Sequence, residues 1–341
     1  MKVLVTGGAG YIGSHTVLCL LQSGHQVVVY DNFCNSSEES LTRVQQLTKK
    51  QVELVEGDIR DVAKLDSVFK QHKIDAVIHF AALKAVGESG KIPLSYYQNN
   101  VHGSVCLLEV MEKHQVHNFI FSSSATVYGE ENAIPYVETM KLGTPASAYG
   151  ASKVMVERIM ADQALANSHF RGVSLRYFNP IGAHPSGLIG EDPKGIPNNL
   201  LPFVAQVAVG KRDKLSIFGD DYDTEDGSCE RDYLHVLDLA EGHVAALDWL
   251  SNHADFTGVE AFNLGTGKGI SVFEIVTAFE KAANKTIAYE VSPRRAGDLP
   301  AFWANAQKAR EQLNWHAKRS LQDMMEDTWR WQSNNPNGYE T

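Results

Sequence analysis

The sequence has few cysteines and no long apolar run. Its 341 residues include four cysteines, Cys19, Cys34, Cys106 and Cys229, and no Cys-x-x-Cys pair. This scatter favours free thiols in a reducing compartment over a disulfide framework. No apolar stretch approaches the roughly eighteen residues of a membrane span, and the first apolar segment already reads as a strand. We therefore expect a cytoplasmic protein without a membrane anchor or a cleavable signal.

Basic charge is also scarce. Lys and Arg number 31 against 41 Asp and Glu, which gives a net charge of −10. This balance argues against binding to a nucleic acid or to an anionic membrane. The close histidine pair, His114 and His117, lies between a predicted helix and a predicted strand, and no metal site is predicted there.

A glycine fingerprint follows the first predicted strand, residues 2–5. Gly7 allows a tight turn, Gly10 lets the backbone approach a pyrophosphate, and Gly13 lets the next helix pack against the strand. The pyrophosphate would lie at the helix N-terminus, where free N–H groups favour negative charge. Asp31 ends the next predicted strand, residues 26–30, and its carboxylate can bind ribose hydroxyls and repel a 2′-phosphate. The motif therefore predicts NAD rather than NADP.

The first 180 residues alternate predicted strands and helices. Short apolar runs typical of buried parallel strands occupy 52–56, 74–80, 118–122 and 172–177, and the longest amphipathic helices are 93–114 and 148–166. This alternation predicts an α/β fold with a Rossmann-type doubly wound parallel sheet over residues 1–180. The ligand should bind beyond the C-terminal ends of the strands.

The regular alternation of predicted strands and helices ends after Asn179. Residues 180–235 are rich in Gly, Pro and Asp, and short strands are expected at 215–218, 261–264 and 287–290 among helices. This pattern predicts a smaller mixed α/β domain, mainly for substrate, over 181–341. The boundary is crossed again if the chain returns to the sheet near residues 230–250.

Tyr149 and Lys153 are four residues apart, which places them on one face of a predicted helix. A phenol with a pKa of about 10 needs roughly 4 kcal/mol of stabilisation to act as a base near neutral pH. The Lys153 ammonium and a positive nicotinamide ring can supply it electrostatically. The run Ser122-Ser123-Ser124 ends the preceding strand, so Ser124 can hydrogen-bond the sugar hydroxyl being oxidised.

The glycine loop, the Tyr149–Lys153 pair and the upstream serine together resemble the extended short-chain dehydrogenase/reductase superfamily. Within it, the sequence is similar to the UDP-glucose 4-epimerases from end to end. The segments that carry this narrower resemblance are 80–89, 122–129, 175–180, 195–200, 231–233 and 294–300.

The resemblance implies a set of NAD contacts. Asp31 and Asn32 would hold the adenosine ribose, and Lys84 and Asn99 would reach a phosphate or ribose. The implied NAD-binding residues are Gly7, Gly10, Tyr11, Ile12, Gly13, Asp31, Asn32, Asp58, Ile59, Phe80, Ala81, Ala82, Lys84, Asn99, Ser122, Ser124, Tyr149, Lys153, Tyr177 and Phe178.

The resemblance also implies a UDP-sugar site. Arg231 and Arg295 offer bidentate, permanently charged contacts to a diphosphate. Asp298 can accept from a ribose hydroxyl, and the backbone at 216–218 would frame the uracil. The implied substrate residues are Ser124, Tyr149, Asn179, Asn199, Leu200, Ser216, Phe218, Arg231, Arg295, Asp298 and Phe302.

Two positions depart from the pattern of the resembled family. Glu230 precedes Arg231 where relatives tend to have an apolar or small residue, and we expect its carboxylate to point to solvent rather than to a diphosphate. Phe302 stands where bacterial relatives usually have tyrosine. Because this position borders the sugar, a bulky aromatic residue should leave little room for an N-acetyl group at C2.

The implied activity is the interconversion of UDP-glucose and UDP-galactose, as part of galactose metabolism. C4 is oxidised with NAD, the 4-keto sugar rotates, and C4 is reduced on its other face. An epimerase of a UDP-N-acetylhexosamine or UDP-pentose is one alternative. A nucleotide-sugar 4,6-dehydratase is another, although Ala125-Thr126 replaces the Asp-Glu pair that its elimination step needs.

A third alternative is a dinucleotide-sensing module without catalysis, but such proteins commonly lose the tyrosine or the lysine, and Ser124, Tyr149 and Lys153 are all present here. The resemblance further implies a homodimer, with the helices at 93–114 and 148–166 as the contact surface.

Overall fold

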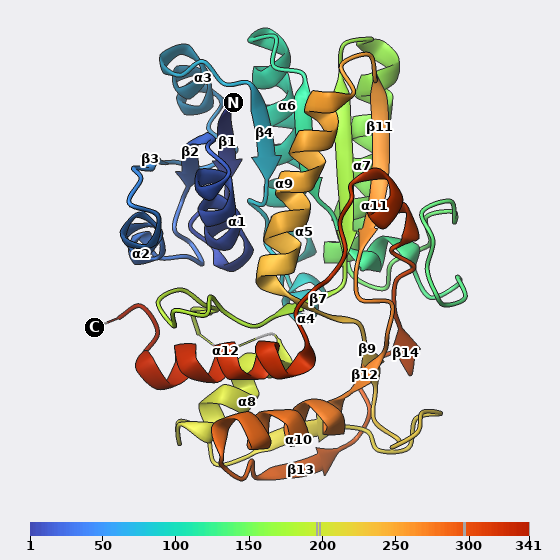
Figure 1. Cartoon of the computed structure of the whole chain (residues 1–341). Helices are drawn as coiled ribbons and strands as arrows, with labels where there is room; N and C mark the ends of the chain where they lie inside the picture. Colours follow the sequence, from blue (N-terminus) through green and yellow to red (C-terminus); the bar gives the residue numbers. More distant parts are fainter. Residues whose placement is uncertain (196, 198, 296–297, 341) are drawn as a thin grey trace.

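The computed structural model describes residues 1–195, 197, 199–295 and 298–340 (Figure 1). Its main feature is a parallel sheet of seven strands in the order β11-β6-β5-β4-β1-β2-β3. This order is that of a doubly wound dinucleotide-binding sheet with β11 added at one edge, and it confirms the predicted fold class. The strands are β1 (Lys2–Thr6), β2 (Gln26–Asp31), β3 (Glu53–Glu56), β4 (Ala76–His79), β5 (Asn118–Ser122), β6 (Arg171–Tyr177) and β11 (Gly258–Leu264).

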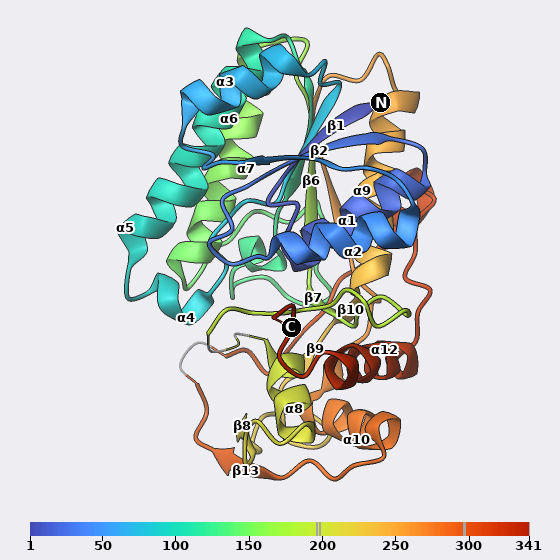
Figure 2. The ribbon, with the colours of Figure 1, turned by 90° about the vertical axis from the view of Figure 1, so that its left-hand side faces the viewer.

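Helices cover both faces of this sheet (Figure 2). Successive side chains of a strand point to opposite faces, so Val3 and Val5 of β1 pack into one apolar core and Leu4 into the other. On the first face lie α1 (Tyr11–Gln22), α2 (Glu38–Thr48) and α9 (Val236–Asn252), and on the second lie α3 (Val62–Gln71), α6 (Gly103–Lys113) and α7 (Ala148–Ala166).

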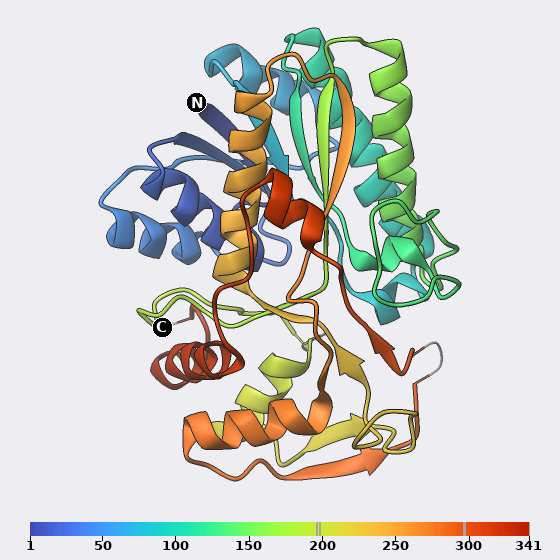
Figure 3. The same cartoon turned by 45° about the vertical axis from the view of Figure 1, so that its right-hand side comes forward.

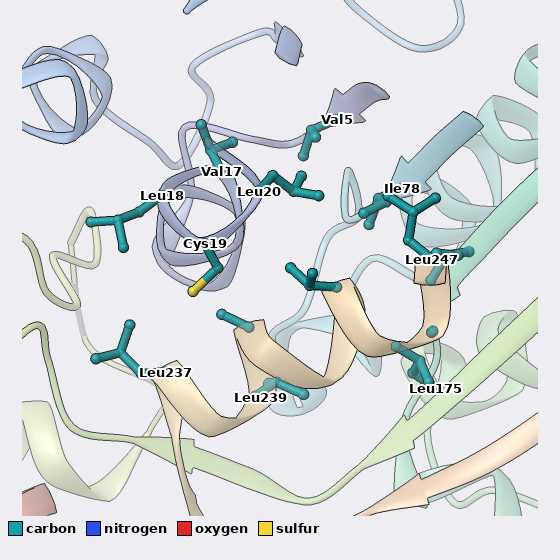
Figure 4. Close-up of a cluster of buried hydrophobic side chains, with 14 of the residues drawn as sticks. Val5, Val17, Leu18, Cys19, Leu20, Ile78, Leu175, Leu237, Leu239 and Leu247 are labelled. Carbon is teal, nitrogen blue, oxygen red and sulfur yellow. The ribbon is translucent and has the colours of Figure 1, made fainter. Parts of the chain in front are cut away.

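The core of the first face lies where α1 meets α9 (Figure 4). Leu18 and Leu20 of α1 and Leu239 and Leu247 of α9 are at most 1% exposed and belong to the same cluster as Val5 of β1. A helix from the second half of the chain therefore covers the sheet built by the first half.

The strand predicted at 261–264 was assigned to the smaller domain, and that assignment is wrong. β11 pairs with β6 along its whole length, from Gly258 opposite Arg171 to Leu264 opposite Tyr177, at the edge of the main sheet (Figure 3). Phe262 and Leu264 are fully buried there. The segment is short and apolar, and such a pattern does not indicate which distant strand it pairs with.

The helix expected over 93–114 is three pieces rather than one. α5 (Pro93–Tyr96) leads into a π-helical stretch, η1 (Tyr97–His102), and then into α6; α4 (Val86–Ser89) precedes them. Within η1, the Asn100 side chain accepts from Leu83 N at 2.8 Å and donates to Ser152 Oγ at 3.1 Å, which ties the wide turn to α7. Leu94, an apolar residue of this expected amphipathic helix, is 78% exposed.

The remaining elements lie mostly beyond the C-terminal ends of the strands (Figures 1 and 2). Their core includes Val204, Ile275, Phe279 and Met325. The strand expected at 287–290 begins two residues later. The elements are β7 (Asn179–Ile181) paired with β10 (Tyr233–His235), β8 (Leu215–Phe218) with β13 (Tyr289–Ser292), β9 (Glu230–Arg231) with β12 (Ile270–Ser271) and β14 (Ala301–Phe302), η2 (Ala125–Tyr128), α8 (Leu200–Ala208), α10 (Val272–Ala283), α11 (Gln307–Gln312) and α12 (Leu321–Asn334).

In the described part of the chain no helix is long and apolar enough to span a membrane. The same residues contain no group of three or more His, Cys, Asp or Glu side chains placed to hold a metal ion.

Candidate active site

A cavity of about 1220 Å³ runs between the C-terminal edge of the main sheet and the smaller substructure that holds α8 and α10. It is lined by all the predicted cofactor and substrate residues except Asp58. Residues as far apart in the sequence as Gly7 and Phe302 therefore meet around one space that is large enough for a dinucleotide and a nucleotide sugar.

The glycine loop is shaped for close approach of a ligand. Gly7 has φ +69°, and a Cβ there would lie 2.7 Å from Ala81 N. A Cβ on Gly13 would lie 2.8 Å from Gly8 Cα and would also clash with the Gly7 carbonyl. A Cβ on Gly10 would meet only Gly7 O, at 3.3 Å, and Gly10 is the N-cap of α1 and lines the cavity. A pyrophosphate fits this cradle at the N-terminus of α1.

Asp31 lies at the end of β2, 7% exposed, beside this loop. Its Oδ2 accepts from Ala9 N at 3.0 Å and its Oδ1 accepts from Ser36 Oγ at 2.8 Å. The carboxylate is thus held rigidly at the cavity wall, where adenosine ribose hydroxyls can reach it.

Asp58 does not line the cavity. Arg60 Nε and Nη2 donate to its two oxygens, each at 2.7 Å, and Asn32 Nδ2 donates at 3.1 Å. The Arg60 guanidinium holds the pKa of Asp58 well below its usual range. Its neighbour Ile59 lines the cavity, so of these two predicted NAD-binding residues only Ile59 faces the space that a cofactor would fill.

The three serines at the end of β5, Ser122 to Ser124, have three different partners. Ser122 Oγ lies 2.5 Å from the Tyr177 hydroxyl, and Ser123 Oγ donates to Glu157 Oε1 at 2.6 Å. Ser124 Oγ accepts from Thr126 Oγ1 at 3.1 Å and lines the cavity. Because that bond uses the oxygen of Ser124 as an acceptor, the Ser124 proton can point into the cavity, toward the Tyr149 hydroxyl or a ligand.

Tyr149 and Lys153 lie in the first turns of α7, whose N-cap Ser147 accepts from Gly150 N at 3.1 Å. Lys153 Nζ donates to the Ser122 carbonyl at 2.6 Å and lies 5.7 Å from the centre of the Tyr149 ring. Both side chains line the cavity beside Ser124, so the predicted catalytic residues are together.

The pKa values differ from the sequence-based expectation. Desolvation raises the pKa of the Tyr149 phenol, although its hydrogen bond with Ser124 opposes this. Burial likewise lowers the pKa of Lys153 to about 7, with Glu157 opposing. The protein groups alone therefore do not bring the phenol near neutrality, because both charged forms are penalised by burial. A positive ligand beside the phenol would act in the opposite direction and lower its pKa.

On the substrate side, Arg231 is held in place by backbone carbonyls. Its Nη1 donates to Leu299 O at 2.8 Å, and its Nη2 lies 3.5 Å from Asp298 Oδ1. Arg295 lies 3.8 Å from the centre of the Phe218 ring. Two guanidinium groups therefore face the cavity near an aromatic residue, an arrangement suited to a diphosphate joined to a base.

Phe302 pairs with Arg231 across β14 and β9, and the Arg231 guanidinium lies 4.6 Å from the centre of its ring. The Phe178 ring is 5.8 Å away on another side. Phe302 is thus a supported wall of the cavity. Glu230 does not line the cavity and is partly exposed, so its charge is directed away from the diphosphate site.

Sequence reasoning missed several residues that line the same space. Glu191 accepts from Lys84 Nζ at 3.2 Å and from Asn199 Nδ2 at 2.7 Å, which links a predicted cofactor residue to a predicted substrate residue. Thr126 and Tyr339 also line the cavity. Nothing in the sequence around Tyr339 indicates this position, which depends on the path of the last residues.

A doubly wound sheet with a glycine cradle and a Ser-Tyr-Lys group at its C-terminal edge defines an NAD-dependent enzyme of the extended short-chain dehydrogenase/reductase class. The chain matches the family described as GDP-mannose 4,6 dehydratase over residues 4–328. It is 60% identical to the UDP-glucose 4-epimerase of Erwinia amylovora over 338 residues, 99% of each chain.

Solved structures agree with this match. The UDP-glucose 4-epimerase of Bifidobacterium longum in complex with NAD⁺ and UDP is 51% identical, with a TM-score of 0.95 over 99% of this chain and 100% of that one. The UDP-Glc/GlcNAc 4-epimerase of Campylobacter jejuni is 38% identical, with a TM-score of 0.84 over 98% and 99%. The chain belongs to the UDP-glucose 4-epimerase family.

Proposed function

We propose that this chain interconverts UDP-glucose and UDP-galactose by inverting C4 of the sugar. The observation that carries this proposal is the shared cavity. Ser124, Tyr149 and Lys153 line it at the sheet edge, and Arg231 and Arg295 line its other end. The reacting sugar would lie between the two groups, with its nucleotide held at one end only.

Bound NAD supplies the acceptor and donor of the C4 hydride. Tyr149 takes the proton of the 4-hydroxyl and later returns it, and Ser124 donates a hydrogen bond to the same oxygen. Lys153 adds positive charge behind the phenol. Arg231 and Arg295 hold the diphosphate while the 4-keto sugar turns, so the intermediate stays bound between the two half-reactions.

A 4,6-dehydratase begins with the same oxidation but needs an acid and a base to eliminate water. Ala125 and Thr126 stand at the start of η2, and neither side chain can titrate near neutral pH. We therefore expect epimerisation without elimination. The test is incubation with UDP-galactose followed by proton NMR, in which UDP-glucose should appear. A 4-keto-6-deoxy sugar would instead identify a dehydratase.

We place this activity in the cytoplasm. The four cysteines are free thiols in the structure, and three of them are buried, which fits a reducing compartment.

The Phe302 wall predicts the substrate range. An acetamido group at C2 needs room that a supported ring yields only at a cost of roughly 1–3 kcal/mol, so UDP-GalNAc should be a poor substrate. Phe302→Cys should raise kcat/KM for UDP-GalNAc about ten-fold, as measured in a coupled assay with each sugar. Turnover of UDP-galactose should change less.

Phe302→Tyr is the matched control, because it keeps the ring that stacks under Arg231 and should leave the preference between the two sugars unchanged. Equal kcat/KM values of the wild-type protein for UDP-galactose and UDP-GalNAc would show that Phe302 does not exclude N-acetylated sugars.

We also propose a homodimer formed through α4, α5 and α7. These helices contact one another and carry large exposed apolar side chains. Leu94 is 78%, Val86 51% and Met155 43% exposed. A patch of this kind on adjoining helices is typical of a protein–protein interface.

Leu94→Glu combined with Met155→Glu should weaken this dimer at least about 10²-fold, since each buried apolar side chain contributes roughly 2 kcal/mol and each change occurs twice in a symmetric interface. Sedimentation at micromolar concentration should then show monomer. Tyr289→Glu is the control, because Tyr289 is an exposed aromatic residue on β13, far from these helices. The interface is misassigned if the double variant stays dimeric or the control dissociates.

A further inference from the structure

A buried ion pair contacts the serine segment, residues 122–124, through Ser123. Arg176 Nε and Nη2 donate to the carboxylate of Glu157 at 3.0 and 2.7 Å, and the two side chains are 7% and 6% exposed. Glu157 Oε1 also accepts from Ser123 Oγ at 2.6 Å. Arg176 Nη1 donates to the Tyr128 hydroxyl at 3.2 Å, so both charged groups are fully engaged.

Glu157 is adjacent to the catalytic residues along two routes. It follows Lys153 by one turn of α7, a spacing that puts the two side chains on one helix face about 5–6 Å apart at Cβ. Its hydrogen-bond donor Ser123 is fully buried and is the chain neighbour of Ser124. A displacement of the Glu157 carboxylate would therefore change the surroundings of Lys153 and the position of the backbone at Ser124.

We propose that Glu157, fixed by Arg176, is a positioning residue of the epimerase reaction. It anchors the serine segment after β5 and provides the negative charge that faces the Lys153 ammonium. This inference rests on the proposed function, because it assigns Lys153 and Ser124 the roles given to them there.

Titratable groups from three elements surround the catalytic lysine. Tyr149 and Glu157 come from α7, His79 comes from β4, and Tyr177 with the paired Arg176 comes from β6. Burial lowers the pKa of His79 to about 3, and burial raises the pKa of both phenols, so these three groups are neutral near pH 7. Glu157 is thus the group in this set whose negative charge opposes loss of the proton from the Lys153 ammonium.

Stability alone does not require this ion pair. Taking two charges out of water costs several kcal/mol for each ion, and apolar side chains of similar volume often replace a buried pair without loss of stability. Removing only one partner is different, because it leaves an unpaired buried charge. A paired apolar replacement can therefore separate a structural role from a positioning role.

The first variant is Glu157→Gln, which keeps the shape and an acceptor for Ser123 but removes the charge. We expect kcat for UDP-galactose to fall about ten-fold with KM within about two-fold of wild type. The alkaline limb of the kcat–pH profile should move to lower pH by about one unit, because an ammonium without its opposing charge loses its proton more easily. Glu326→Gln, the same change at an exposed position of α12, should alter neither quantity.

The second variant is Glu157→Leu with Arg176→Met, which leaves no unpaired buried charge. It keeps the proposal testable if Glu157→Gln fails to fold. It should melt within a few degrees of wild type and still show the low kcat and the shifted alkaline limb. Wild-type kcat and pH profile in this folded variant, or a lower melting temperature of Glu157→Gln with an unmoved limb, would overturn the proposal. An inactive wild-type protein would instead refute the epimerase assignment itself.

Discussion

Tyr149→Phe should lower kcat for UDP-galactose by at least about 10²-fold and leave the affinity for UDP unchanged. General-base catalysis contributes about this factor, and phenylalanine keeps the ring while removing the hydroxyl that takes the proton. The proposed UDP contacts, Arg231 and Arg295, line the cavity from the smaller substructure and not from α7, so calorimetry with UDP should give the wild-type value. Steady-state kinetics with UDP-galactose measures the loss.

The titration of the phenol gives a second readout for the same residue. Desolvation raises the pKa of Tyr149, a hydrogen bond with Ser124 opposes this, and burial lowers the pKa of the neighbouring Lys153 to about 7. The phenol should therefore titrate at lower pH in the NAD-loaded protein than after removal of NAD, as measured by ultraviolet difference absorbance. Lys153→Met should move the titration to higher pH. Tyr289→Phe, on the exposed strand β13, should change neither activity nor this signal.

A Tyr149→Phe variant with near wild-type kcat, together with the absence of phenolate near neutral pH in the NAD-loaded protein, would remove Tyr149 from the role of base. Retained activity with a phenolate still present would point to another tyrosine as its source.

Gly13→Ala should release NAD from a protein that otherwise keeps it. The wild-type chain should retain NAD through gel filtration and turn over without added nicotinamide, since losing reduced cofactor in mid-reaction would strand a ketone. A Cβ at position 13 would overlap the Gly7 carbonyl and lie 2.8 Å from Gly8 Cα, so the cradle must shift. A strain of roughly 1–3 kcal/mol weakens NAD binding about ten- to hundred-fold.

The measurement is NAD content after denaturation of each purified variant. Ser251→Ala is the control, because Ser251 is an exposed residue near the end of α9 that does not line the cavity. It should keep the wild-type content. Failure of the wild-type protein to turn over unless free NAD is added, with a ketone released in proportion, would contradict tight retention.

Local sequence patterns predicted the elements whose signals are local. The helix over 148–166 was placed at its observed bounds, because an N-cap serine and a helical run define it without help from the rest of the fold. The glycine loop and the strand before it were likewise predictable from local sequence. At Gly7 and Gly13 a Cβ would clash with neighbouring backbone atoms, so only glycine fits there.

Features that depend on distant partners were not predictable in this way. The pairing of β11 with β6 joins residues more than 80 positions apart, and no property of 258–264 selects that edge of the sheet. The contacts of Glu157 with Ser123 and Arg176 also form only after β5, α7 and β6 come together. The same is true of Glu191, which becomes a link between Lys84 and Asn199 only in the folded chain.

The most direct test of C4 inversion within one site is the fate of the C4 hydrogen. UDP-galactose carrying deuterium at C4 is incubated with the purified protein, without added nicotinamide, in unlabelled water. Proton NMR should show UDP-glucose that keeps deuterium at C4, because the hydride that leaves this carbon returns to it while the keto sugar stays bound. UDP-glucose with hydrogen at C4, or no UDP-glucose until NAD is added, would contradict the account.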